Sequence, residues 1–220
     1  MDVPFDVLEI ILLSLKVTTT AVLLGVLIGI PFGAFLGLYS FPGKKLVVTL
    51  VFTCMGLPPV LIGVIVYLLL SKYGMLGSLQ LLFTPEAMII AQFLLVTPIL
   101  IGLTMSSVQA QERTYWETAK SLGANPAQLI WTIIKESRRG IWSGVAAAYG
   151  RAISEVGAVM LVGGNIEHYT RVMTTAIILE TRMGNYTTGL QLGLVLLVIS
   201  FIFNSFLMMG MIDKLNLKRR

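Results

Sequence analysis

Apolar residues fill most of this chain in long runs, and polar residues are gathered in the segments between them. A helix needs roughly 20 apolar residues to cross a bilayer core about 30 Å thick. Four runs are long enough, at residues 17–38, 46–70, 87–108 and 190–212. A fifth run, 142–162, is weaker because it contains Arg151 and Glu155. The pattern predicts an all-α integral membrane protein with five transmembrane helices in one domain, residues 1–220.

The first apolar run is expected to stay in the protein rather than to be cleaved as a signal. The residues before it include Asp2, Asp6 and Glu9 instead of a basic segment, and no small-residue cleavage site follows. Together with residues 8–16 it forms a stretch of about 31 residues, or ~46 Å as a helix. This is too long for one upright span, so we expect a tilted helix or a start that lies along the interface.

Composition supports a membrane protein and excludes several kinds of site. Hydrophobic residues make up 56% of the chain and charged residues only 12%, and the mean hydropathy of +0.86 exceeds that of soluble domains. Cys54 is the only cysteine, so cysteines cannot build a disulfide or a metal cluster. His168 is the only histidine and has no second ligand nearby in sequence, which disfavours a metal site.

The basic residues predict the orientation of the chain. Cytoplasmic loops of membrane proteins carry the excess of Lys and Arg. In the five-span arrangement, eleven of the sixteen Lys and Arg residues lie on one side, three lie on the other, and Lys16 and Arg151 lie within apolar runs. The amino end is therefore predicted outside and the carboxyl end in the cytoplasm. This orientation accounts for the net charge of +5 without a nucleic-acid partner, and the basic carboxyl end is expected to contact anionic membrane lipid.

The polar segment 109–139, between the third and fourth runs, carries its own helix signals. Thr114 and Glu117 have the spacing of a capping box that starts a helix. Gly123 suits a left-handed helix end, and Asn125 followed by Pro126 suits a new helix start. The segment is predicted to form two short helices joined by a tight elbow.

The second of these helices has an apolar stripe at helical spacing. It consists of Leu129, Ile130, Ile133 and Ile134. Two interpretations stay open from this pattern. Either the segment folds back on its own membrane domain, or it is a stiff element that docks into another protein.

The residues ETAKSLGANPAQLIWTII resemble the EAA loop of ABC-importer permeases. That loop reads Glu-Ala-Ala, three residues, Gly, nine residues, Ile. The matching positions here are Glu117, Ala119, Gly123 and Ile133. Thr118 departs from the middle alanine, and Lys135-Glu136 stands where Leu-Pro usually follows, so we expect the contact to centre on residues 117–123.

The resemblance implies the fold of a type I ABC importer transmembrane domain and a coupling segment that inserts into a separate ATPase. The implied coupling residues are Glu117, Thr118, Ala119, Lys120, Ser121, Leu122, Gly123, Asn125 and Pro126. The chain contains no G-x-x-x-x-G-K-[ST] phosphate loop. We therefore expect ATP to bind a partner subunit, with no cofactor and no enzymatic activity in this chain.

Charges within the fifth, weaker run have two possible roles. Arg151 and Glu155 are four residues apart, which places them on one face of a helix. Each charge costs about 2.5–3.5 kcal/mol in a bilayer on insertion scales, so such residues face a bundle interior or a wet cavity. They are either an ion pair that fixes helix packing or direct elements of a permeation path.

The stretch GRAISEVGAVMLVGGNI resembles the fourth span and outer loop of molybdate, tungstate and sulfate permeases, and the residues after it are most similar to the tungstate-specific branch. The matching positions are Arg151, Glu155, Gly157, Gly164, Asn165 and Ile166.

Proline and glycine mark two further features. Pro58 and Pro59 lie within the second run, where they predict a kink near a gate, a packing irregularity or a shifted helix start. Glycines at positions 25, 29, 33 and 37 form a strip for close helix packing, within the bundle or at a dimer contact. The candidate transport path or gate consists of Pro58, Pro59, Arg151, Ser154, Glu155 and Gly157.

The resemblance implies a permease in the cell inner membrane, forming a homodimeric pore with two ATP-binding subunits and an extracytoplasmic substrate-binding protein. The expected substrate is a tetrahedral oxyanion, first tungstate, then molybdate, then sulfate or phosphate. A stand-alone channel or a non-transporting sensor subunit remains an alternative. An intramembrane enzyme is disfavoured because Glu155 is the only central carboxylate and has no histidine or cysteine pair beside it.

Overall fold

The computed structural model describes the backbone of residues 5–212, and their side chains except those of 5–6, 112–114, 116–120 and 208–212. The described chain is helical and contains no strand, which confirms the predicted fold class. The helices are α1 (Phe5–Leu38), α2 (Lys44–Met55), α3 (Pro59–Leu70), the short 3-10 helix η1 (Gly77–Leu79), α4 (Pro85–Ser121), α5 (Pro126–Ile153), α6 (Gly157–Gly163), α7 (Met173–Arg182) and α8 (Tyr186–Ile212).

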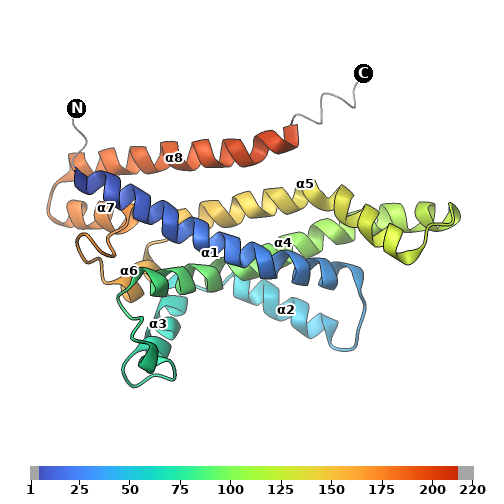
Figure 1. The fold of residues 1–220 in the computed structure, drawn as a ribbon, viewed down its shortest axis with the longest axis horizontal. Coiled ribbons are helices and arrows are strands. Elements are labelled where there is room, and N and C mark those ends of the chain that lie inside the picture. Colours follow the sequence, from blue (N-terminus) through green and yellow to red (C-terminus); the bar gives the residue numbers. More distant parts are fainter. Residues whose placement is uncertain (1–4, 213–220) are drawn as a thin grey trace.

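The long helices α1, α4, α5 and α8 run along the long axis of the molecule, and α3 projects across it (Figure 1). The start of α1 and the link between α4 and α5 lie at opposite ends of this axis. The helix α8 runs from the end where α1 begins toward the end that holds the α4–α5 link. This arrangement fits an odd number of crossings.

The five predicted spans occur as three continuous helices and two broken ones. Three helical stretches are long and apolar enough to cross a membrane, namely Val7–Leu38, Pro85–Gln111 and Tyr186–Leu207. The helices α2 and α3 form a fourth candidate span with a bend of 100° between them, and α5 and α6 a fifth with a bend of 54°. The break in the second run falls at Pro58 and Pro59, where an irregularity was expected, whereas the break between α5 and α6 within the run 142–162 was not predicted. The orientation of the chain stays a prediction.

The break between α2 and α3 follows from local chemistry. Pro58, with φ −60° and ψ 127°, is the N-cap of α3, and Pro59 occupies its first position. Proline lacks the N–H that would continue α2, and it restricts the residue before it to extended backbone. A new helix start at Pro59 and a bend of 100° are both observed, and a role near a gate stays a prediction. Pro98 behaves differently, since α4 continues through it.

The glycine strip of α1 packs within the bundle, against α4. A Cβ built on Gly29 would lie 2.7 Å from Leu100 Cβ, and one on Gly33 would lie 2.6 Å from the Ile101 carbonyl oxygen. Gly25 and Gly37 meet α4 side chains equally closely. Any larger side chain would force the two helices apart, so the strip sets their separation. α1 itself is one unbroken helix, which favours the tilted span over a separate interfacial segment.

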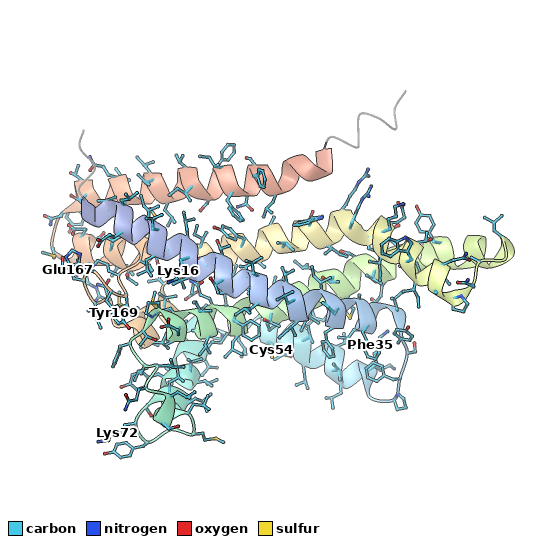
Figure 2. The ribbon with its side chains drawn as sticks, viewed as in Figure 1. Lys16, Phe35, Cys54, Lys72, Glu167 and Tyr169 are labelled. Atoms are coloured by element: carbon cyan, nitrogen blue, oxygen red, sulfur yellow. The ribbon has the colours of Figure 1, made fainter. Side chains whose placement is uncertain are left out.

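Apolar side chains cover the outside of the bundle as well as its core (Figure 2). The main core lies among α1, α3, α4, α5 and α6, and includes Tyr149, Val159 and Leu100. On α8, large apolar side chains such as Phe201 and Phe206 are mostly exposed. A helix that is apolar on its outer face as well as its inner one is what a lipid environment requires.

Candidate coupling segment and transport path

The elbow between α4 and α5 forms as predicted. Gly123 has φ +76°, in the left-handed region that favours glycine. Asn125 Oδ1 accepts a hydrogen bond from Gln128 N at 2.9 Å, and Asn125 N donates to Gln128 Oε1 at 3.0 Å. This is a complete capping box, with Pro126 at the first helical position.

The helices on either side of the elbow are not short. α4 passes through Thr114 without interruption and ends at Ser121, so the prediction of a helix start at Thr114 was wrong. An established helix gains one hydrogen bond for each residue added, so α4 continues past the capping signal at Thr114. It ends at Ser121, just before the left-handed Gly123. The predicted pair of short helices within 109–139 is therefore the end of α4 and the beginning of α5.

One face of the coupling segment packs on the membrane domain and another is exposed. Leu129 and Ile133 are buried against Ala34 of α1 and Val108 of α4. Leu122 at the elbow is 81% exposed and Trp131 is 67% exposed. Leu129 and Ile133 of the apolar stripe thus fold back on the membrane domain, and docking of the exposed face into another protein stays a prediction. The side chains of Glu117, Thr118, Ala119 and Lys120 lie outside the described residues.

The helix of the second broken span is interrupted at Ser154, Glu155 and Val156, between α5 and α6. Glu155 is only 5% exposed, and its Oε1 accepts a hydrogen bond from Ala158 N at 3.1 Å, in the first turn of α6. Its Oε2 lies 4.0 Å from Arg151 Nη2, and the Arg151 side chain is 45% exposed. The prediction that both charges share one helix face was wrong, because α5 ends at Ile153 before Glu155 is reached.

Arg151 is therefore held only weakly by its carboxylate. The Ser154 hydroxyl, also exposed, donates to Gly150 O at 2.9 Å and shares the last turn of α5 with Arg151. An ion pair at the limit of contact distance with a half-exposed partner contributes little to stability.

The two broken spans meet where each is interrupted. A Cβ built on Gly157 would lie 2.7 Å from Val60 Cγ2, and one on Gly63 would lie 2.8 Å from Ala158 Cα. The first turn of α3, which begins at Pro59, is thus packed against the first turn of α6. Predicted path residues from two distant parts of the sequence come together here, and the coupling residues 121–126 lie at the other end of α5 (Figure 1).

Two residues that sequence reasoning missed hold the second break. Gln92 Nε2 of α4 donates to the Ala152 carbonyl at 3.1 Å, and Thr174 Oγ1 of α7 donates to the Glu155 carbonyl at 2.9 Å. Gln92 lies in an apolar run and Thr174 in a loop-rich region, with no motif around either. The one sequence signal for this role was the amide of Gln92, a polar group within the apolar run 87–108.

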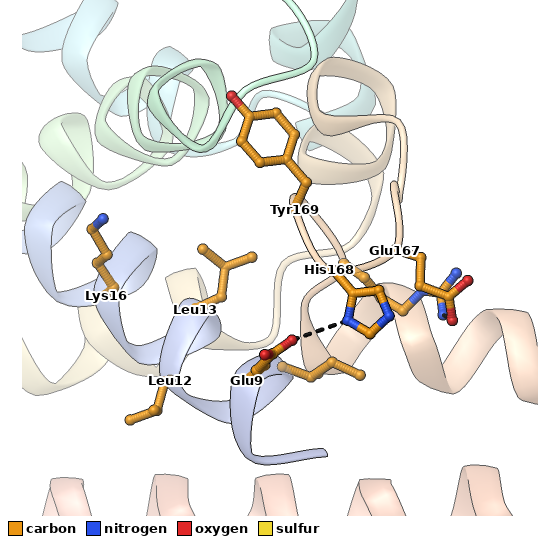
Figure 3. A pocket seen from close by; sticks show the side chains of 9 residues that line it. Glu9, Leu12, Leu13, Lys16, Glu167, His168 and Tyr169 are labelled. Atoms are coloured by element: carbon orange, nitrogen blue, oxygen red, sulfur yellow. Dashed lines mark hydrogen bonds and ion pairs between the residues drawn. The ribbon is translucent and has the colours of Figure 1, made fainter. Parts of the chain in front are cut away.

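A cavity of about 300 Å³ lies away from the two breaks, between the start of α1 and the 167–171 segment (Figure 3). Glu9, Lys16, Tyr169 and apolar residues of α1 line it. His168 Nδ1 lies 3.1 Å from Glu9 Oε2 on its rim. Among the described residues, no group of three His, Cys, Asp or Glu side chains is placed to hold a metal ion.

Comparison with known proteins identifies the family of this chain. Residues 29–216 match the family described as the binding-protein-dependent transport system inner membrane component. The chain belongs to this family of ABC transporter permeases. As a permease it is a multi-pass membrane protein and a transport component.

The permease is similar to several characterised relatives. It is 45% identical to the tungstate uptake system permease protein TupB of Peptoclostridium acidaminophilum over 92% of this chain and 90% of the relative. It is 42% identical to TupB of Campylobacter jejuni over 76% of this chain and 70% of the relative. The molybdenum transport permease of Escherichia coli K12 is 27% identical, over 77% of each chain.

The fold of the permease also matches a solved structure. The crystal structure of an amino acid ABC transporter with histidines has a TM-score of 0.69, over 96% of this chain and 98% of that chain, at 20% identity. At this identity the match concerns the fold alone. It agrees with the type I importer architecture expected from the sequence.

Proposed function

We propose that this permease imports a tetrahedral oxyanion, with tungstate as the preferred substrate, through a pore formed by two copies of the chain. The observation that carries the proposal is the 45% identity to a tungstate uptake permease over 92% of the chain, against 27% for a molybdenum permease. Molybdate, and then sulfate or phosphate, are the alternative substrates of the same permease.

Energy is supplied by two separate ATP-binding subunits, each of which contacts one elbow. The elbow offers an exposed apolar residue, Leu122, beside a left-handed glycine and a capped helix start at Asn125. The sequence lacks a phosphate loop of its own. The family description, which names a binding protein, supports delivery of the anion by an extracytoplasmic substrate-binding protein.

Helix α5 links the coupling end to the broken spans. It is a single helix of 28 residues from Pro126 to Ile153, about 42 Å long at 1.5 Å per residue. Movement imposed on the elbow by the ATPase therefore displaces the far end of α5, where α6 packs on α3. Closure of the two ATPases would open the outer mouth of the pore and close the inner one, which gives alternating access.

Arg151 is the residue best suited to contact the anion along this path. A guanidinium forms bidentate charge-assisted hydrogen bonds with oxyanions. Glu155 does not neutralise it tightly, because Oε1 is engaged with Ala158 N and Oε2 lies 4.0 Å away. The half-exposed position of the guanidinium gives a passing anion access to it.

The test is uptake of labelled tungstate into proteoliposomes that contain the permease with its ATPase and substrate-binding protein. We expect uptake that requires ATP and is inhibited by unlabelled tungstate at lower concentrations than by molybdate, sulfate or phosphate. Calorimetric titration of the substrate-binding protein with the four anions should give the same order. Uptake that is independent of ATP would indicate a channel, and no uptake of any of them would favour a sensor subunit.

A further inference from the structure

The break between α5 and α6 is held by side chains from two other helices. The last turn of a helix leaves carbonyl groups without helical partners, and buried carbonyls need donors from elsewhere. At this break the local donors are Ser154 N to Gly150 O at 3.4 Å and Glu155 N to Ala152 O at 3.1 Å. The Ser154 hydroxyl also donates locally, to Gly150 O at 2.9 Å and to Arg151 O at 3.2 Å. Side-chain donors from other helices are Gln92 and Thr174, which we call the break clamp.

Gln92 provides the α4 half of the break clamp. Its side chain is only 4% exposed, and Nε2 donates to Ala152 O at 3.1 Å, across 60 residues of sequence. In the described part of the chain, no donor reaches its Oε1. Gln92, Thr174, Glu155, Ser14 and Thr18 line a polar cavity of about 10 Å³ at the break. A space of this size holds at most about one water molecule, so the surrounding groups are closely packed.

Thr174 provides the α7 half. It is 6% exposed, and its hydroxyl donates to Glu155 O at 2.9 Å. The neighbouring Met173 N donates to Ser14 Oγ of α1 at 2.8 Å. The break is therefore tied through Gln92 to α4 and through Thr174 and Met173 to α7 and α1. These are buried directional bonds, which fix an angle between helices in a way that apolar packing does not.

We propose that Gln92 and Thr174 are positioning residues that fix the 54° bend between α5 and α6, and thereby determine how movement of α5 is converted into movement at the α3–α6 contact. The inference rests on the proposed function, because it assigns the break clamp a role in transport. The clamp lies at the carboxyl end of α5, and the elbow proposed to contact the ATPase lies at its amino end. Loss of the clamp is therefore expected to reduce transport per ATP hydrolysed rather than hydrolysis itself.

The test compares substitutions that remove a donor with substitutions that keep it. Thr174→Val keeps the shape and removes the hydroxyl, and Thr174→Ser keeps the hydroxyl. Gln92→Met keeps the length and removes the amide. Thr181→Val is a matched control, because Thr181 lies on the same helix but its hydroxyl donates to Ile177 O within that helix. Each variant is reconstituted with its ATPase and substrate-binding protein, and anion uptake and ATP hydrolysis are measured together.

We expect the ratio of uptake to hydrolysis to fall about 5- to 10-fold in Thr174→Val and in Gln92→Met, the effect of losing roughly one hydrogen bond. Thr174→Ser and Thr181→Val should keep the wild-type ratio. Uptake and hydrolysis that fall in proportion to the amount of folded protein would overturn the proposal. So would failure of both donor-removing variants to fold, because the clamp would then support the fold rather than the bend.

A second measurement does not depend on transport. Amide hydrogen exchange of the purified permease should become faster over residues 154–163 in Thr174→Val and Gln92→Met, and should stay unchanged there in Thr181→Val. Unchanged exchange in the two donor-removing variants would overturn the proposal. Absence of ATP-dependent uptake in the wild-type complex, with the exchange effect present, would instead count against the proposed function.

Discussion

Gly63 of α3 packs directly against Ala158 of α6, so closely that a Cβ on Gly63 would lie 2.8 Å from the Ala158 Cα. The contact joins the second helices of the two broken spans, and the two residues are separated by 95 positions in the chain. The same Cβ would lie 3.0 Å from Leu161 Cδ1 and 3.3 Å from the Ala158 carbonyl oxygen. The contact therefore depends on glycine at position 63.

Replacing Gly63 by valine should destabilise the permease and disrupt this contact. The added atoms meet backbone, which cannot move aside like the end of a flexible side chain, and overpacking of this kind costs about 1–3 kcal/mol. We expect a lower thermal unfolding temperature in detergent and reduced anion uptake. Gly193→Val on α8 is the control, since a Cβ there meets no atom within 4 Å. Equal stability of both variants would mean that α3 and α6 are not tightly packed.

The elbow should be sensitive to backbone strain at Gly123 rather than to side-chain size. A Cβ there would meet no atom within 4 Å, but the φ of +76° is unfavourable for residues with a side chain. Gly123→Ala should cost about 1–2 kcal/mol at the elbow and lower uptake, whereas Gly123→Asn should be tolerated better, because asparagine adopts this conformation more easily. Uptake assays on both variants check this, and identical activities would argue against the strained elbow.

Exposed apolar residues at the elbow should contribute to ATPase binding without supporting the fold. Leu122 is 81% exposed, so Leu122→Ser should leave thermal stability within about 0.5 kcal/mol. It should weaken copurification of the ATPase by roughly tenfold if Leu122 fills a pocket in the partner. Lys135→Ala, on the exposed part of α5 beyond the expected contact, is the control. A larger effect at Lys135 than at Leu122 would place the contact elsewhere on the segment.

Arg151 and Glu155 should give different phenotypes. Arg151 is half exposed and 4.0 Å from its carboxylate, so Arg151→Ala should leave the unfolding temperature nearly unchanged. Losing charge-assisted bonds of about 1.5–3 kcal/mol should raise the apparent KM for the anion roughly 10- to 100-fold. Glu155→Gln keeps an oxygen that accepts from Ala158 N, so it should fold and transport. Equal loss of folded protein in both variants would support a purely structural ion pair.

The elbow was predictable because its signals are local. The left-handed Gly123 and the cap formed by Asn125 and Pro126 depend on the conformational preferences of single residues and their immediate neighbours. Thr114 shows the limit of such signals. Its capping-box spacing was present, yet α4 continues through it, because a cap matters only where the chain on its amino side is not already helical.

By itself, the sequence determined that this is a membrane protein with five apolar segments, an irregularity of one of three kinds at Pro58 and Pro59, and an elbow at Gly123. Hydropathy, missing amide donors and restricted φ angles act within a few residues, and the sequence displays them directly. Only the tertiary structure decided that the fifth run breaks at Ser154–Val156, that Gln92 and Thr174 hold that break, and that the glycine strip of α1 faces α4. These features depend on contacts between residues far apart in the chain, where the energy of packing and of buried hydrogen bonds outweighs local preference.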